Sequence, residues 1–124
     1  MSASIDLNPK HHKIVSDILY EYSPDRDVLV FGSRAKWSAK DKSDLDLCIM
    51  GDEPLPKKTM VALTDALEES SLPIKVDVVE WAKIEDGFRE IIKRDGVELG
   101  WPELSLAIVY PVRGSWTNRG VLLR

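Results

Sequence analysis

Two aspartates on one short segment, with a Gly-Ser pair before them, are the residues of this sequence best suited to chemistry. Residues 30–50 read VFGSRAKWSAKDKSDLDLCIM, so ten residues separate Ser33 from Asp44, and one residue separates Asp44 from Asp46. Side chains of a strand alternate between its two faces, so Asp44 and Asp46 are predicted to share a face. Neighbouring carboxylates repel each other unless a positive charge lies between them. Such oxygen ligands suit Mg²⁺, which binds through one or two carboxylates, water and substrate phosphate.

A third acidic residue, Asp77, lies within the apolar segment IKVDVVEW at residues 74–81. A carboxylate in the middle of an apolar strand is costly to bury without a partner. If the two acid-bearing strands are neighbours, Asp77 joins Asp44 and Asp46 in one acidic cluster. Two metal ions about 4 Å apart in such a cluster can bind the attacking and leaving oxygens of an in-line displacement. An ion pair between Asp77 and a lysine or arginine is the structural alternative.

The Gly32-Ser33 pair offers groups that bind phosphate. Glycine lets the backbone approach a phosphate closely, and amides at a turn that enters a helix attract anions. The Ser33 hydroxyl adds a donor, and Ser33 is also expected to cap a short helix over residues 34–37. Arg34 and Lys36 add positive charge beside this turn in a chain whose net charge is −4. For Arg34, both a phosphate contact and a solvated surface position are open.

Helices and strands alternate along the rest of the sequence. Asn8-Pro9 is a typical helix start, and Gly96 suits the end of a later helix. The apolar spacing predicts helices over residues 9–22, 57–71 and 84–95, and strands over residues 27–31, 44–50 and 74–81. This order predicts an α/β (α+β) fold of one domain with a small sheet. Residues 101–124 have a weaker pattern and form an extension that either binds a partner or is a loose tail.

Length and composition limit the classes of function. A length of 124 residues suggests one domain, and the balance of 17 basic against 21 acidic residues argues against a broad nucleic-acid-binding surface. The single cysteine, Cys48, excludes an internal disulfide and fits a reducing cytosol. The sequence has no signal peptide pattern and no stretch near the roughly 20 apolar residues that span a bilayer. A cytoplasmic protein without membrane association is therefore expected.

Taken together, these motifs resemble the signature of the nucleotidyltransferase superfamily that includes DNA polymerase beta and the aminoglycoside nucleotidyltransferases. The short chain, with FGSRA and SDLDL, is most similar to the minimal nucleotidyltransferases, which are encoded beside a HEPN-domain protein as a toxin–antitoxin pair. The resemblance places a nucleotidyltransferase domain at residues 8–100, with a mixed sheet flanked by helices. It implies phosphate binding at Gly32, Ser33 and Arg34, and Mg²⁺ binding at Asp44, Asp46 and Asp77. It also implies that Asp77 takes the proton from the attacking hydroxyl.

The resemblance implies transfer of AMP from ATP to a tyrosine of a HEPN-domain RNase toxin, which silences the toxin. The two proteins would form a hetero-oligomer. One alternative is a non-catalytic antitoxin that blocks the toxin sterically. Another is a small-molecule nucleotidyltransferase that modifies an antibiotic, although such enzymes usually carry a further helical domain for the acceptor. The nucleotide preference, the number of nucleotides transferred and the acceptor are open.

Trp37 departs from the family pattern, because relatives commonly have a small residue, often glycine, at this position. A bulky ring there narrows the nucleotide pocket, stacks on the base or covers an edge of the core. The sequence leaves these three readings open.

Overall fold

A mixed sheet of four strands lies between helices in the computed structural model, which describes residues 5–100. The elements are α1 (Pro9–Tyr22), β1 (Val28–Phe31), the 3₁₀ helix η1 (Gly32–Arg34), β2 (Leu45–Ile49), α2 (Lys57–Glu69), β3 (Val76–Glu80), the 3₁₀ helix η2 (Trp81–Lys83), α3 (Asp86–Asp95) and β4 (Val97–Glu98). The predicted α/β (α+β) class with a small mixed sheet flanked by helices is confirmed. The predicted extension, residues 101–124, lies outside the described residues.

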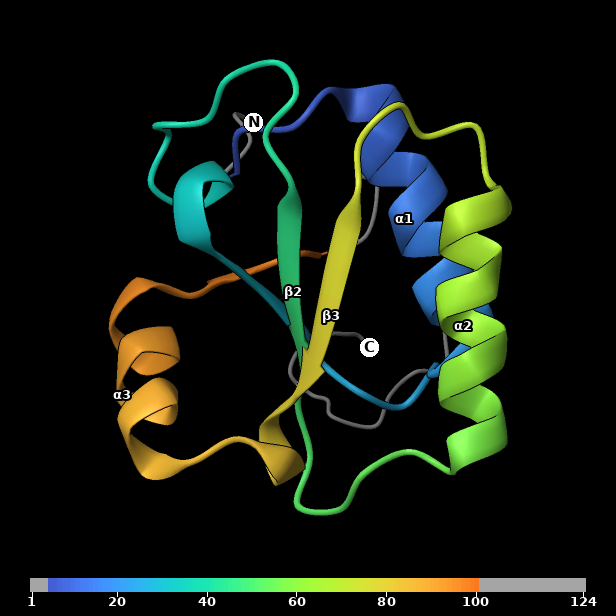
Figure 1. Ribbon diagram of the computed structural model, residues 1–124, viewed down its shortest axis with the longest axis vertical. Coiled ribbons are helices and arrows are strands. Elements are labelled where there is room, and N and C mark those ends of the chain that lie inside the picture. Colours follow the sequence, from blue (N-terminus) through green and yellow to red (C-terminus); the bar gives the residue numbers. More distant parts are fainter. Residues whose placement is uncertain (1–4, 101–124) are drawn as a thin grey trace, which may run out of the picture.

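The order of strands in the sheet is β3-β2-β1-β4. β1 runs antiparallel to both β2 and β4, whereas β2 and β3 are parallel. A parallel pair needs a crossover connection, and α2 provides it between β2 and β3. In Figure 1, α1 and α2 lie together on one side of the sheet, and α3 lies on the other side.

The core fills the space between the sheet and the pair α1 and α2. Alternate residues of β2 point into this core, which also contains buried side chains of β1, α1 and α2. Its fully or nearly fully buried members include Val15, Leu19, Val30, Leu45, Leu47, Ile49, Leu63 and Leu67. Because side chains alternate along a strand, Asp46 and Cys48 of β2 face the opposite side, toward α3.

α3 packs on that second face through aromatic and glycine contacts. The rings of Phe31 on β1 and Phe88 on α3 meet edge to face, with centroids 5.5 Å apart. A Cβ at Gly96, directly after α3, would lie against the carbonyl of Ile92 and the side chain of Leu29. The helix end is therefore held close to β1, the strand that leads into the Gly-Ser turn.

Local signals explain where several elements begin and end. Asn8 accepts a hydrogen bond of 2.8 Å from the Lys10 amide ahead of Pro9, as expected for a helix start. The prediction that Ser33 caps a helix over residues 34–37 is wrong, because the short helix begins at Gly32 and contains Ser33. α3 begins at Asp86, after the separate turn η2, rather than at residue 84. None of the helices within residues 5–100 is both long and apolar enough to cross a membrane.

Candidate active site

The sheet register brings two of the predicted acids together. In the parallel pair of β2 and β3, Asp46 is the partner of Asp77, and in the antiparallel pair of β1 and β2, Phe31 is the partner of Asp46. Partner residues on neighbouring strands project to the same face. Phe31 contacts Phe88 of α3, so Asp46 and Asp77 both lie on the α3 side of the sheet. Asp44 lies one residue before β2 and is exposed.

Gly32 lies directly against one of these acids. Its backbone has a φ of 77°, in the left-handed region that glycine adopts without strain. A Cβ at this position would collide with the Asp46 carboxylate. Glycine is thus required both by the backbone conformation and by the close approach of the carboxylate. The Gly-Ser turn therefore lies directly beside Asp46.

Asp44 and Asp77 influence Asp46 electrostatically. Partial burial raises the pKa of Asp46 above its ordinary value, and the nearby charges of Asp77 and then Asp44 raise it further. Each neighbouring negative charge disfavours the ionised form of Asp46. The site therefore has a local excess of negative charge, which a bound cation would relieve.

The predicted alternative role of Asp77 is also present. Lys75 Nζ lies 3.5 Å from Asp77 Oδ1, where the Lys75 side chain is largely exposed and that of Asp77 is about half exposed. Exposed ion pairs contribute little to stability, so this contact leaves the Asp77 carboxylate available for other partners.

The pair of Asp46 and Asp77 fits a magnesium site that a bound phosphate would complete. Within residues 5–100, no three histidine, cysteine or acidic side chains form a group that could hold a metal ion, and this includes Asp44, Asp46 and Asp77. Mg²⁺ seldom needs such a group, because it retains water and uses one or two carboxylates with substrate phosphates. Asp46, with its raised pKa and its two acidic neighbours, has the donor chemistry for this kind of site.

Arg34 takes a position that neither interpretation of the sequence expected. Its side chain is buried, and the guanidinium donates to backbone carbonyls, with Nη1 2.8 Å from the oxygen of Asp6 and Nη2 3.0 Å from that of Ser43. Longer bonds reach the carbonyls of Lys40 and Asp41. The expected solvated surface position is therefore wrong. These bonds also occupy the guanidinium that was expected to bind phosphate, and no sequence pattern indicates them.

The turn after Gly32 is held by its own backbone. The amide of Lys36 donates to the Gly32 carbonyl at 3.2 Å, and the amide of Ser38 donates to the Ser33 carbonyl at 2.9 Å. Between them, Trp37 has a φ of 59° and a side chain that is 58% exposed. Left-handed backbone is unusual for a bulky residue and common for glycine, which accounts for the small residue expected here. The ring is thus largely accessible to solvent, and the three possibilities for its role remain predictions.

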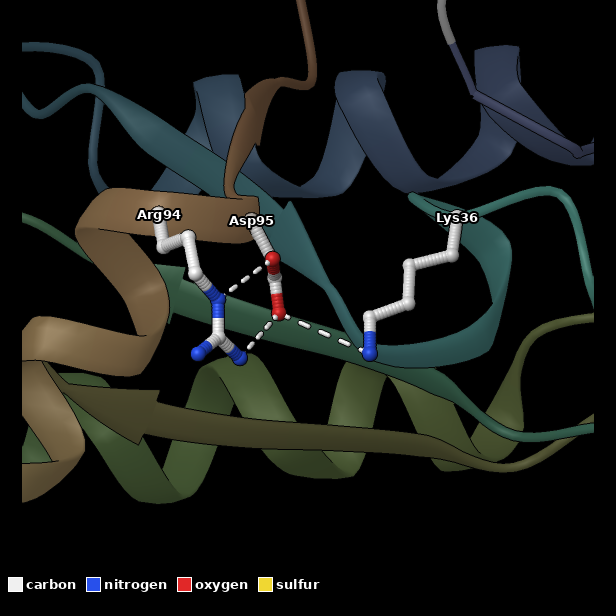
Figure 2. A network of polar contacts seen from close by, with 3 residues as sticks. All are labelled: Lys36, Arg94 and Asp95. Carbon is white, nitrogen blue, oxygen red and sulfur yellow. Dashed lines mark hydrogen bonds and ion pairs between the residues drawn. The ribbon is translucent and has the colours of Figure 1, made fainter.

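Lys36 extends toward α3 and meets an acid that the sequence analysis did not single out. Its Nζ lies 3.6 Å from Asp95 Oδ2, and Asp95 also pairs with Arg94 (Figure 2). The contact joins residues almost sixty positions apart, and no local sequence pattern predicts it. The Gly-Ser turn is thus linked to the end of α3.

Cys48 follows Asp46 on the same face but is fully buried. Burial raises the pKa of its thiol to about 11, against smaller lowering effects of Arg89 and of a hydrogen bond from the Trp81 backbone. The thiol therefore stays protonated near neutral pH and is a packing residue rather than a nucleophile.

Comparison with known proteins identifies the family to which this chain belongs. A family model described as "Polymerase beta, Nucleotidyltransferase" matches residues 13–100. The chain belongs to this nucleotidyltransferase family. It is also 44% identical over 92 residues to a Haemophilus influenzae protein named "Probable protein adenylyltransferase MntA", an alignment that covers 74% of this chain and 81% of that protein.

Solved structures share the fold of this nucleotidyltransferase at lower sequence identity. A toxin–antitoxin crystal structure with AMP-PNP matches with a TM-score of 0.61 and 20% identity, over 80% of this chain and 77% of that one. A complex of tri-AMPylated Shewanella oneidensis HEPN toxin with MNT antitoxin matches with a TM-score of 0.56 and 18% identity, over 77% and 74% of the two chains. Both matches confirm the architecture described above.

Proposed function

We propose that this nucleotidyltransferase is a Mg²⁺-dependent protein adenylyltransferase that transfers AMP from ATP to a tyrosine hydroxyl of a HEPN-domain toxin in the cytoplasm. The observation that carries the proposal is the pairing of Asp46 with Asp77 on one face of the sheet, with Gly32 against Asp46. The name of the Haemophilus influenzae relative supports protein adenylyl transfer. The choice of partner is supported by the solved complex of a HEPN toxin with an MNT antitoxin, which contains a chain of the same fold. This chain would form a hetero-oligomer with its toxin.

Each part of the site has a role in this reaction. Asp44 and Asp46, with Asp77, would hold the metal, which supplies positive charge to the phosphates. The backbone amides of the Gly32-Ser33 turn and the Ser33 hydroxyl bind the phosphates that leave. Lys36 adds a cation beside them.

Asp77 would act as the base. The tyrosine oxygen attacks the α-phosphorus of ATP, and its proton passes to the Asp77 carboxylate. The new bond joins the tyrosine oxygen to phosphorus, the bond between the α- and β-phosphates breaks, and diphosphate leaves. The half-exposed position of Asp77 gives an acceptor protein access to the carboxylate.

The proposal is tested by incubating the protein with labelled ATP, Mg²⁺ and a HEPN-domain protein encoded beside it. We expect labelled toxin, and a loss of at least about 100-fold in rate for Asp44→Ala if electrostatic stabilisation dominates. Asp17→Ala is a matched control, because Asp17 is an exposed acid on α1 that pairs with Lys13. If no label is transferred, and a variant without Asp44 and Asp46 still protects cells from the toxin, the steric antitoxin replaces this proposal.

A further inference from the structure

A network of three charged side chains connects the phosphate turn to α3. Asp95 accepts two hydrogen bonds of 3.0 Å from Arg94, one from Nε to Oδ1 and one from Nη2 to Oδ2. Oδ2 also lies 3.6 Å from the Nζ of Lys36, the fourth residue after Gly32. Figure 2 shows the Lys36 side chain extending from its turn toward the carboxylate at the end of α3. Through this network, Asp95 of α3 contacts the ammonium of Lys36, which belongs to the turn.

Asp95 occupies an unusual place for an acid. It is the last residue of α3, where the partial negative charge of the helix end disfavours a carboxylate. Even so, its side chain is only 14% exposed, whereas Arg94 is 68% and Lys36 is 55% exposed. The hydrogen bonds and charge of Arg94, with a smaller contribution from Lys36, hold the pKa of Asp95 below its ordinary value. The carboxylate is therefore ionised and kept between two cations.

The position of Asp95 is fixed relative to the site. Phe88 of α3 packs on Phe31, the residue directly before Gly32, and Gly96 lies against Leu29. A free lysine side chain samples many rotamers, and part of this entropy is lost whenever its ammonium is held by a ligand. A fixed carboxylate that already restrains Lys36 reduces this loss.

The charges in the network suit an orienting role. The two hydrogen bonds from Arg94 compensate the negative charge of Asp95, so the three side chains together carry a charge of +1. Lys36 therefore keeps its attraction for an anion while Asp95 limits where its ammonium lies. An ammonium has three donors, so it can contact a carboxylate and a phosphate at the same time.

We propose that Asp95 is a positioning residue, which directs the ammonium of Lys36 toward the triphosphate bound at the Gly32-Ser33 turn. The inference rests on the proposed function for the identity of the ligand. It assigns a role to α3, an element that carries none of the predicted site residues. Arg94 contributes by fixing and neutralising Asp95.

A double-mutant cycle tests the proposal. Steady-state rates with Mg²⁺ and ATP are measured for wild type, Lys36→Ala, Asp95→Asn and the double variant. We expect Lys36→Ala to raise KM for ATP by about 10- to 100-fold and Asp95→Asn by about 3- to 10-fold, with kcat changed much less. The double variant should match Lys36→Ala, because Asp95 acts only through Lys36. Asp95→Glu should recover part of the affinity, since it keeps the carboxylate.

Glu90→Gln is the matched control on the same helix. Glu90 is exposed and pairs with Lys93 at 3.4 Å, so this variant also removes one acidic partner of a lysine from α3. Its KM should equal that of wild type. An Asp95→Asn effect that is undiminished in the Lys36→Ala background would overturn the proposal, because Asp95 would then act on the stability of α3 rather than on Lys36. Thermal unfolding of each variant establishes that it is folded.

A binding measurement separates this inference from the proposed function. The same four proteins are titrated calorimetrically with a non-hydrolysable ATP analogue and Mg²⁺, without any acceptor. If wild type binds the analogue but transfers no AMP, the proposed function fails, whereas the pattern of dissociation constants still supports or contradicts the role of Asp95. A wild-type protein that does not bind the analogue would contradict both.

Discussion

Asp46 and Asp77 are direct partners across the parallel strands β2 and β3, and their carboxylates lie on the same face of the sheet. Two negative charges in neighbouring positions oppose folding unless a cation lies between them. The charge of Asp77 contributes to the raised pKa of Asp46, after partial burial, which is the largest cause. The arrangement that suits the site to a metal–nucleotide complex therefore weakens the unliganded fold.

Asp46→Asn is expected to raise the thermal stability of the metal-free protein at neutral pH. The pKa of Asp46 is raised above its ordinary 3.8 in the folded state, so the folded protein holds this proton more tightly than the unfolded chain does. Its unfavourable contribution is absent below pH 3.8 and develops as the pH rises through the raised value. Thermal unfolding of both proteins in EDTA from pH 3 to 8 should show a difference that grows in this direction.

Added Mg²⁺ with a non-hydrolysable ATP analogue should make wild type more stable than Asp46→Asn, the reverse of the order expected without ligand. The ligand stabilises wild type because it binds the folded state alone, and Asp46→Asn should lose most of this gain. An equal shift of the melting temperature in both proteins would show that Asp46 does not hold the metal.

Gly32→Ala is expected to destabilise the protein by about 1–3 kcal/mol and to abolish AMP transfer. The added methyl group meets the Asp46 carboxylate, and the φ of 77° is strained for alanine. Gly87→Ala is the control, because a Cβ at Gly87 meets nothing within 4 Å and the residue lies in α3. Urea unfolding should show a neutral or stabilising effect for this control, by at most about 1 kcal/mol. Gly32→Ala with wild-type stability and activity would remove the argument that the turn and the acid share a site.

The sequence predicted which strands carry the acids, because that information is local, but it placed Asp77 beside the others only if the two strands were neighbours. Alternation along residues 44–50 and 74–81 determines which side chains share a face, and the register observed for β2 and β3 then places Asp46 beside Asp77. The three helices and three strands that the apolar spacing predicts all occur, with ends that differ by a few residues. β4 was not predicted, because two residues, Val97 and Glu98, are too few to show a periodic pattern.

Contacts between distant residues could not be predicted in this way. Asp95 meets Lys36 only because α3 packs beside β1, and Arg34 is buried only because the chain at Asp6 and the loop at Ser43 close around it. A charged residue beside a phosphate turn looks the same in sequence whether its side chain points to a ligand or into the protein.

Arg34→Lys is expected to destabilise the protein by about 2–4 kcal/mol, because a lysine ammonium cannot reach the separate carbonyls that the planar guanidinium contacts. Arg26→Lys is the matched control, since Arg26 donates one bond of 3.1 Å, to the carbonyl of Met50, and should cost less than about 1 kcal/mol. Chemical unfolding gives both values. If Arg34→Lys keeps its stability but loses affinity for ATP, Arg34 binds phosphate directly, as the family resemblance implied.

Trp37 provides a test of backbone strain beside the site. Trp37→Gly and Trp37→Ala both remove the exposed ring, so the difference between them isolates the effect of the φ of 59°. Glycine adopts this conformation freely, whereas alanine does not, and we expect the glycine variant to be more stable than the alanine variant by about 1 kcal/mol. Urea unfolding of the two proteins measures this difference. Equal stability would show that the turn relaxes when the ring is removed.

The same two proteins reveal whether the ring assists the reaction, because an indole that contacts ATP or the acceptor would leave both variants with the same loss of activity despite their different stabilities.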